Sequence, residues 1–306
     1  MPPLTNPLLR RPLPLLSIST TTLLLATTLA PRTQGKPKMS TSPTPRTTPL
    51  PPRHATWPYT PADFARADPT PDASFYSSPR FVTHIDDAAI ASLKAYYASA
   101  LPRQCRVLDF CSSWVSHYPR EIEAAVARGE LRVVGMGMNE AELQANGVLG
   151  RGGRVLADLN ESADVGGALR GAGVLAEGEE GEGEGGFFDA ATCVVSVDYL
   201  TDPVGVLRSL RGVMREGARV HLAVSNRCFP TKAVARWLRV DEGERVRMVG
   251  DYLHFAGWRD VEVVELSDGR VEQEGGAEGG QNSLQGLMGW MGMRGRDPLW
   301  VVRAVK

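Results

Sequence analysis

The chain has 306 residues, a formal charge of −1 and an apolar fraction of 42%, which suits one or two globular domains with a sizeable core. The near-zero charge hides two unlike parts, because residues 1–60 carry seven Lys and Arg but no acid, and the first acid is Asp63. Of the 34 bases in the chain, 27 remain for residues 61–306, against 35 acids, a charge of −8. This balance excludes a basic body that binds nucleic acid through its phosphates.

The first 60 residues are rich in Pro, Ser and Thr, a composition that cannot build a packed core, and we predict a disordered leader there. Acid-free leaders with Arg, Ser and Thr are typical of organelle transit peptides, which predicts a mitochondrial protein. Two alternatives stay open. The run LLSISTTTLLLATTLA at residues 15–30 is like a secretory signal, although it is too short and too rich in Thr to predict a stable transmembrane segment. If Met39 is the working start, the protein is cytoplasmic.

The cysteines favour a reducing compartment. No CxxC pair and no Cys/His cluster with metal-ligand spacing occurs, so the sequence predicts free thiols and no metal site. Free Cys packs as a small hydrophobic residue, and disulfides are rare in reducing compartments. The four positions are Cys105, Cys111, Cys193 and Cys228.

After an N-terminal extension at residues 61–84, helical and strand patterns alternate along the chain. We expect helices to begin near Asp86, Pro119, Asn139 and Asp202, where a capping residue or Pro precedes apolar positions at helical spacing. Two further helical stretches are expected at residues 231–239 and 244–256. The expected strands are the apolar runs at residues 106–110, 131–136, 155–157, 188–197, 219–224, 260–266 and 299–305.

This order predicts the fold class. Five strands separated by helical stretches predict a mostly parallel sheet with helices on both faces. The last two strands have only a loop between them, so we expect them to pair antiparallel at one edge. The prediction is therefore an α/β, doubly wound, mostly parallel seven-stranded sheet with a C-terminal antiparallel strand pair, over residues 85–306. Two Gly-rich segments, about 171–186 and 271–296, are expected to be flexible inserts.

Open parallel sheets bind ligands beyond the carboxyl ends of their strands, so the residues that follow each strand carry the functional information. Here the sequence resembles the class I S-adenosylmethionine-dependent methyltransferases, closest to the type 11 small-molecule group, over roughly residues 85–306. The resemblance implies a Rossmann-like methyltransferase fold, S-adenosyl-L-methionine as cofactor and a small-molecule substrate. It rests on VLDFCSSW, VVGMGMNEAEL, ADLNE, FAGWRDVEVVEL, LWVVRAV and, most specifically, FDAATCVVSVDYLTDPVGVLRSLRGVM.

Two positions depart from the family pattern. The first motif of the family is an acid followed by glycines, DxGxGxG, which lets the backbone approach the cofactor, whereas residues 110–114 after Asp109 contain no glycine. At the end of the second strand, Gly137 stands where the family usually has an acid that binds the ribose hydroxyls. A non-catalytic binding or scaffold protein with a degenerate cofactor site therefore stays open as the alternative function.

The resemblance assigns a cofactor cradle residue by residue. Asp158 and Leu159 match the contact to the adenine edge, and Asn139, just past the second strand, would replace the ribose acid. Small side chains at Cys111 and Ser113 would leave room for the methionine part. The complete predicted set is Asp109, Cys111, Ser113, Asn139, Asp158, Leu159 and Cys193.

Other residues near the strand ends are candidates for catalysis and substrate binding. His117 follows the first-motif loop, and an imidazole accepts protons near neutral pH. Asp198 and Tyr199 follow the fourth strand, where catalytic groups often lie in this family. For the substrate we predict Trp114, Asn226 and Arg227, the last because a guanidinium binds carboxylate or phosphate through two N–H groups.

The predicted function is methyl transfer from S-adenosylmethionine to a small molecule. In this reaction the enzyme mainly aligns the nucleophile with the methyl carbon and sulfur. A nicotinamide-dependent oxidoreductase gains no support, because it too needs a Gly-rich turn after the first strand. The sequence predicts no nucleic-acid partner and leaves the oligomeric state open.

Overall fold

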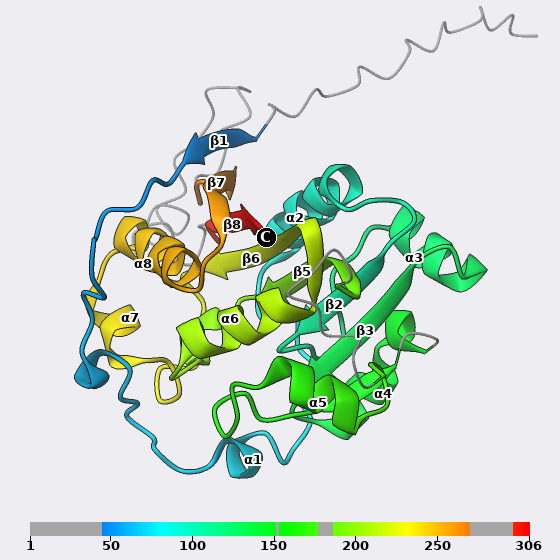
Figure 1. The fold of residues 1–306 in the computed structure, drawn as a ribbon, viewed down its shortest axis with the longest axis horizontal. Helices are drawn as coiled ribbons and strands as arrows, with labels where there is room; N and C mark the ends of the chain where they lie inside the picture. The colour runs from blue at the N-terminus through cyan, green and yellow to red at the C-terminus, as the bar shows by residue number, and fades with distance from the viewer. Residues whose placement is uncertain (1–44, 151–152, 177–185, 270–295) are drawn as a thin grey trace, which may run out of the picture. The chain divides into compact units, whose positions relative to one another are not determined.

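The computed structural model describes residues 45–150, 153–176, 186–269 and 296–306. Its centre is an eight-stranded sheet in the order β1-β7-β8-β6-β5-β2-β3-β4 (Figure 1). All seven predicted strands are present, together with one more, β1. The strands are β1 (Arg46–Pro49), β2 (Arg106–Phe110), β3 (Arg132–Gly137), β4 (Arg154–Leu156), β5 (Phe188–Val194), β6 (Met214–Ser225), β7 (Arg259–Ser267) and β8 (Leu299–Val305).

Several helices begin where their capping residues predict. The side chains of Asp86, Asn139 and Asp202 each accept a hydrogen bond from the backbone N–H three residues further on. The α-helices are α1 (Asp72–Phe75), α2 (Asp87–Ala100), α3 (Arg120–Arg128), α4 (Glu140–Ala145), α5 (Val165–Gly171), α6 (Pro203–Val213), α7 (Ala235–Arg239) and α8 (Glu242–Phe255). Three short 3-10 turns complete the set: η1 (Pro61–Asp63), η2 (Gly147–Leu149) and η3 (Val197–Tyr199).

The strand directions confirm the predicted fold class. The strands from β2 to β6 pair in parallel with their neighbours, and β8 lies between β6 and β7, antiparallel to both. The expectation that the last two strands form the edge of the sheet is wrong, because β1 pairs antiparallel with β7 on its outer side.

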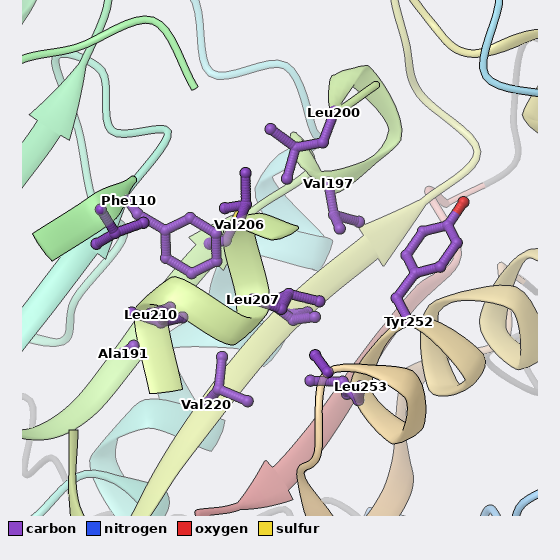
Figure 2. Close-up of a cluster of buried hydrophobic side chains, with 14 of the residues drawn as sticks. Phe110, Ala191, Val197, Leu200, Val206, Leu207, Leu210, Val220, Tyr252 and Leu253 are labelled. Carbon is purple, nitrogen blue, oxygen red and sulfur yellow. The ribbon is translucent and has the colours of Figure 1, made fainter. Parts of the chain in front are cut away.

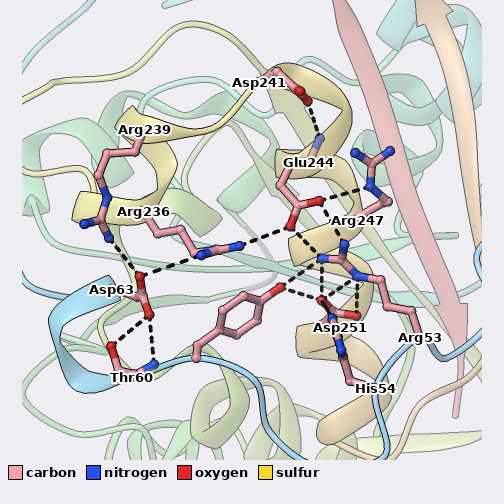
Figure 3. A network of polar contacts seen from close by, with 11 residues as sticks. Arg53, His54, Thr60, Asp63, Arg236, Arg239, Asp241, Glu244, Arg247 and Asp251 are labelled. Atoms are coloured by element: carbon pink, nitrogen blue, oxygen red, sulfur yellow. Dashed lines mark hydrogen bonds and ion pairs between the residues drawn. The ribbon is translucent and has the colours of Figure 1, made fainter.

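The predicted leader at residues 1–60 extends too far along the chain, because residues 45–60 belong to the fold. Besides β1, this stretch contains Arg53, whose guanidinium donates to Glu244 and Asp251 of α8 at 2.7–3.1 Å (Figure 3). Tyr59 is buried and donates to the same carboxylate of Asp251. Composition alone missed this docking because it depends on partners about 190 residues away. The predictions for residues 1–44, and most of the two Gly-rich inserts, lie outside the described residues.

Helices cover both faces of the sheet. On one face, α5, α6 and α8 pack on a core that includes Phe110, Leu207 and Leu253 (Figure 2). On the other face, α2, α3 and α4 pack on a second core, to which Leu93 and Ile122 belong. Within the described ranges, no helix combines the length and the hydropathy that crossing a membrane requires.

Candidate functional site

A cavity of about 260 Å³ lies at the carboxyl ends of four parallel strands. Its lining includes residues 111–113 after β2, 137–139 after β3, 157–160 at the end of β4 and 194–196 at the end of β5. Doubly wound sheets bind their ligands at this place. The volume is near the lower end of small-molecule clefts, about 300–1,000 Å³.

Two groups of segments enclose this cavity. We call the strand ends and the loops that follow them the floor (residues 109–117, 136–142, 157–160 and 194–200). The opposite wall, here called the roof, consists of residues 66–84 and 227–232. The roof residues that line the cavity are Asp72, Tyr76, Arg80, Thr83, His84, Arg227, Cys228 and Phe229.

Asp109 fastens the glycine-free loop of the floor. Its carboxylate accepts hydrogen bonds from the hydroxyls of Ser112 and Ser116 at 2.6 and 2.7 Å and from Thr192 of β5 at 3.0 Å. Burial raises the pKa of Asp109, although the three hydroxyl hydrogen bonds act in the opposite direction. Serine side chains therefore hold the backbone of this loop.

Backbone strain is concentrated at the cavity. The structure gives a positive φ to five non-glycine residues of the described ranges, and all but Asp260 line the cavity: His84, Cys111, His117 and Val195. Cys111, with φ of 54°, occupies the position of the first glycine in the family motif and takes the conformation that glycine adopts most easily. Residues held in such conformations cluster at functional sites, which supports a functional role for this cavity.

The missing ribose acid has a packing explanation. The backbone N–H of Ser112 donates to the carbonyl of Met136 at 2.7 Å, which brings the loop after β2 against the end of β3. A Cβ at Gly137 would lie 2.1 Å from the carbonyl oxygen of Ser112. Any side chain at residue 137 would therefore require the loop to move.

Asn139 connects the floor to the roof. Its amide nitrogen donates to the carbonyls of Tyr76 at 2.9 Å and Ser77 at 3.3 Å, and its oxygen accepts from the N–H of Glu142. Both amide hydrogens are thus engaged, and the predicted ribose contact of Asn139 stays a prediction.

Glu142 lines the cavity but is not among the predicted site residues. It is buried, and its Oε1 accepts the backbone N–H of Arg80 at 2.6 Å. Its second oxygen, Oε2, has no hydrogen-bond partner in the described part of the chain. An acid in the first turn after β3 is the sequence signal that would have identified it.

Asp158 and Leu159, which we predict to contact the adenine edge, both line the cavity. Asp158 Oδ1 accepts from the N–H groups of Asn160 and Glu161, which shapes the turn after β4. The Asn160 amide then donates to Asp72 of the roof at 2.7 Å and to the carbonyl of Tyr199 at 2.9 Å.

Two of the predicted catalytic residues line the cavity. Burial lowers the pKa of His117 to about 4, so its imidazole is neutral at pH 7. Burial raises the pKa of Tyr199, and its oxygen accepts the N–H of Phe229 at 2.8 Å, so Tyr199 keeps its proton and positions the roof. His84 also lines the cavity, and burial together with the charge of Arg80 lowers its pKa.

Two predicted residues near β5 lie beneath the cavity and do not line it. Asp198 is 2% exposed because the η3 turn directs it into the protein. Its Oδ2 has no hydrogen-bond partner in the ranges that the structure describes, and burial raises its pKa to about 8. Cys193 belongs to the buried core. The pKa of the Cys193 thiol is raised well above its usual value, mainly by a hydrogen bond with Cys111 and secondly by burial.

The predicted substrate residues are divided between the cavity and its surroundings. Trp114 lies outside it, because its indole N–H donates to the carbonyl of Val82 at 2.8 Å, and Asn226 is exposed on the surface. Arg227 lines the cavity, but its guanidinium is 60% exposed and pairs with Asp297 at 2.7 Å. The cavity residues that sequence reasoning missed are Asp72, Tyr76, Arg80, His84, Glu142, Asn160 and Phe229.

No protein-family model and no curated protein matches the chain. Similar solved structures include a SAM-dependent methyltransferase from Archaeoglobus fulgidus (14% identity, 71% of this chain, 94% of that one, TM-score 0.43) and one from Mesorhizobium loti (13%, 70%, 98%, 0.39). Phosphoethanolamine N-methyltransferase 2 from Haemonchus contortus is 16% identical over 72% of this chain, with a TM-score of 0.39. The match spans 52% of that enzyme's length. At such identities the likeness concerns the fold alone.

Proposed function

We propose that the protein is an S-adenosylmethionine-dependent methyltransferase that acts on a small molecule. The observation that carries this proposal is the sheet itself, in which β8 lies antiparallel between β6 and β7 and a cavity lies at the carboxyl ends of the parallel strands. Four residues that line this cavity have strained backbone. The antiparallel pairing of β7 with β8 is the sheet ending that the sequence resemblance implies, and the cavity lies beyond the strand ends from which the predicted cofactor residues come.

The cavity fits the cofactor on its adenine side and differs from the family on its ribose side. Asp158 Oδ2 has no partner among the described residues and would accept from the adenine amino group, next to the apolar side chain of Leu159. At the ribose, Gly137 offers no acceptor, and the free Oε2 of Glu142 would supply one. Cys111 and Ser113 would hold the methionine part.

When bound, the cofactor supplies an electrophilic methyl group with a neutral thioether as the leaving group. The task of the chain is therefore to bind and align the acceptor and to exclude water, which the roof does by covering the floor. His117 is neutral at pH 7, so its imidazole lone pair accepts a hydrogen bond from a hydroxyl or amine of the acceptor.

The alternative, a binding protein without catalysis, is favoured by the close approach of Ser112 to Gly137, which leaves the ribose side without the usual acid. The two functions differ in whether methyl groups are transferred. Labelled methyl groups passing from the cofactor to small molecules of a cell extract would support the enzyme, and cofactor binding without any transfer would support the alternative.

Titration calorimetry of the full chain with S-adenosylhomocysteine tests the cofactor site. We expect Glu142→Gln to weaken binding at least tenfold, because it removes a charged acceptor from the cavity. Glu140→Gln is the matched control on the same helix turn, since Glu140 is exposed and lies outside the cavity, and it should leave the affinity unchanged. The absence of heat and of any thermal shift at millimolar ligand would overturn the proposal.

We also infer a mitochondrial location from the acid-free composition of the leader. Imaging of fluorescent fusions of the full chain and of a chain that starts at Met39 tests this. Mitochondrial signal from the full chain alone would support the inference, and a cytoplasmic signal from both would contradict it.

A further inference from the structure

Arg80 extends from the roof to the cavity and is fixed among aromatic rings. Its Cζ lies 4.2 Å from the ring centroid of Phe75, 5.7 Å from that of Tyr76 and 5.5 Å from that of Phe229. Its Nη2 donates to the carbonyl of Phe75 at 2.9 Å, and its backbone N–H donates to Glu142. Stacking of a guanidinium on aromatic faces is favourable and keeps the side chain in one place.

The guanidinium of Arg80 lacks a carboxylate partner in the described part of the chain. The side chain is partly buried, and its Nη1 atom is buried without a hydrogen-bond partner among the described residues. The other cations that hold the N-terminal segment are all paired: Arg66 with Asp72, Lys232 with Asp68 and Asp72, and Arg53 with Glu244 and Asp251. A buried N–H donor of a cation that has no partner is costly, so a site that keeps one is expected to receive an acceptor from a ligand.

The neighbouring acids form no ion pair with the Arg80 guanidinium in the described part of the chain. Asp72 is already shared by Arg66 and Lys232, and the near oxygen of Glu142 accepts the backbone N–H of Arg80. The two nearby imidazoles, His84 and His117, add no negative charge. Of the two roof arginines that line the cavity, Arg227 pairs with Asp297, whereas Arg80 has no carboxylate partner in the described part of the chain and lies beside the rings of Tyr76 and Phe229.

We propose that the acceptor substrate carries an oxyanion, either a carboxylate or a phosphate, on a flat apolar body, and that Arg80 binds the oxyanion. A planar guanidinium offers N–H groups that match either oxyanion. In Arg80 the Nη2 atom donates to the carbonyl of Phe75, so Nη1 is the donor left for the ligand. The rings of Tyr76 and Phe229, which line the cavity, would pack on the flat body. That this ligand is a substrate rests on the proposed methyltransferase function, whereas its negative charge is inferred from the geometry of Arg80 alone.

Calorimetry on the full chain with three flat probes tests this site: benzoate, phenyl phosphate and neutral benzyl alcohol. We expect at least one anion to bind at least tenfold more tightly than benzyl alcohol, and the tighter anion identifies carboxylate or phosphate as the group recognised. Arg80→Gln should weaken that anion at least tenfold, and Arg80→Lys should weaken it less. Arg103→Gln is the control for the loss of one positive charge, since Arg103 is exposed and lies outside the cavity, and it should change the affinity less than twofold.

A titration of the same variants with S-adenosylhomocysteine separates the two proposals. Anion binding through Arg80 without cofactor binding would overturn the methyltransferase function and leave the anion site standing. Equal affinity for benzoate, phenyl phosphate and benzyl alcohol would overturn the anion site, as would undiminished anion binding by folded Arg80→Gln protein. If that variant fails to fold, the preference of the wild-type chain for anions over benzyl alcohol decides.

Discussion

The floor and the roof of the cavity both contain buried aspartates, yet the pKa values of these aspartates shift in opposite directions. On the floor, burial raises the pKa of Asp109 and raises that of Asp198, just beneath the cavity, to about 8. In the roof, burial alone would raise the pKa of Asp72, but hydrogen bonds from Arg66 and Asn160 lower it. Hydroxyl and backbone hydrogen bonds therefore hold the floor, and ion pairs hold the roof.

The two walls also differ in the chain distance that their contacts span. The hydroxyls that fasten Asp109 come from its own loop and from the adjacent strand. In the roof, Lys232 donates to the carbonyl of Thr70, which is 162 residues away. The floor is thus a product of the sheet, whereas the roof forms only when distant segments meet with their charges matched.

The largest expected effect is on the roof, from Lys232→Met. The Lys232 ammonium is fully buried and lies 2.7 Å from the carbonyl of Thr70, 3.2 Å from Asp68 and 3.3 Å from Asp72. Its removal leaves buried carboxylate charge less compensated, so we expect the free energy of unfolding to fall by about 3–5 kcal/mol in urea titrations.

The control for this variant is Arg239→Gln, which breaks an ion pair with Asp63 at 2.8 Å. The Arg239 side chain is 60% exposed, so its loss should cost less than about 1 kcal/mol. Equal losses in the two variants would contradict the view that buried ion pairs hold the roof.

The next effect concerns Asp198, and it depends on pH. In the unfolded chain this carboxyl ionises near pH 4, whereas in the folded protein its pKa is about 8. Wild-type stability is therefore lost as the pH rises through this window, because unfolding releases a proton. Asp198→Asn has no charge to bury, so its stability does not depend on pH in this way. We therefore expect the free energy of unfolding of Asp198→Asn, minus that of the wild type, to be about 2–4 kcal/mol larger at pH 9 than at pH 5.

Thermal unfolding at pH 5 and pH 9 measures this difference. Asp260→Asn is the control, because Asp260 is exposed. The stability difference between this variant and the wild type should change by less than about 0.5 kcal/mol between the two pH values. A stability difference for Asp198→Asn that is the same at both pH values would show that Asp198 is ionised in the folded protein.

The floor was largely predictable from the sequence, because strand ends can be located by apolar runs and capping residues. Three residues chosen in this way, Cys111, Asp158 and Tyr199, line the cavity, and their roles stay predictions. This reasoning failed for Cys193 and Asp198, because counting residues along a strand does not fix which face a side chain takes at the strand end or in the following turn.

The roof was not predictable, for a different physical reason. Residues 61–84 have no helical or strand periodicity, and their positions depend on single long-range hydrogen bonds such as that from Asn139 to Tyr76. Arg80 therefore carried no signal in the sequence, although the proposed anion site depends on it. Contacts between segments that lack periodicity leave no pattern for sequence reasoning to detect.

The smallest effect tests the floor at its departure from the family. Gly137→Asp restores the usual acid, but its Cβ would lie 2.1 Å from the Ser112 carbonyl oxygen, so the loop after β2 must shift. We expect a loss of about 1–3 kcal/mol in stability and weaker binding of S-adenosylhomocysteine. Gly147→Ala is the control, since a Cβ there meets nothing within 4 Å, and it should be nearly neutral. Tighter binding by Gly137→Asp at unchanged stability would contradict this expectation. It would mean that the loop after β2 moves at little cost, so that the site depends on the ion pairs of the roof and not on a rigid floor.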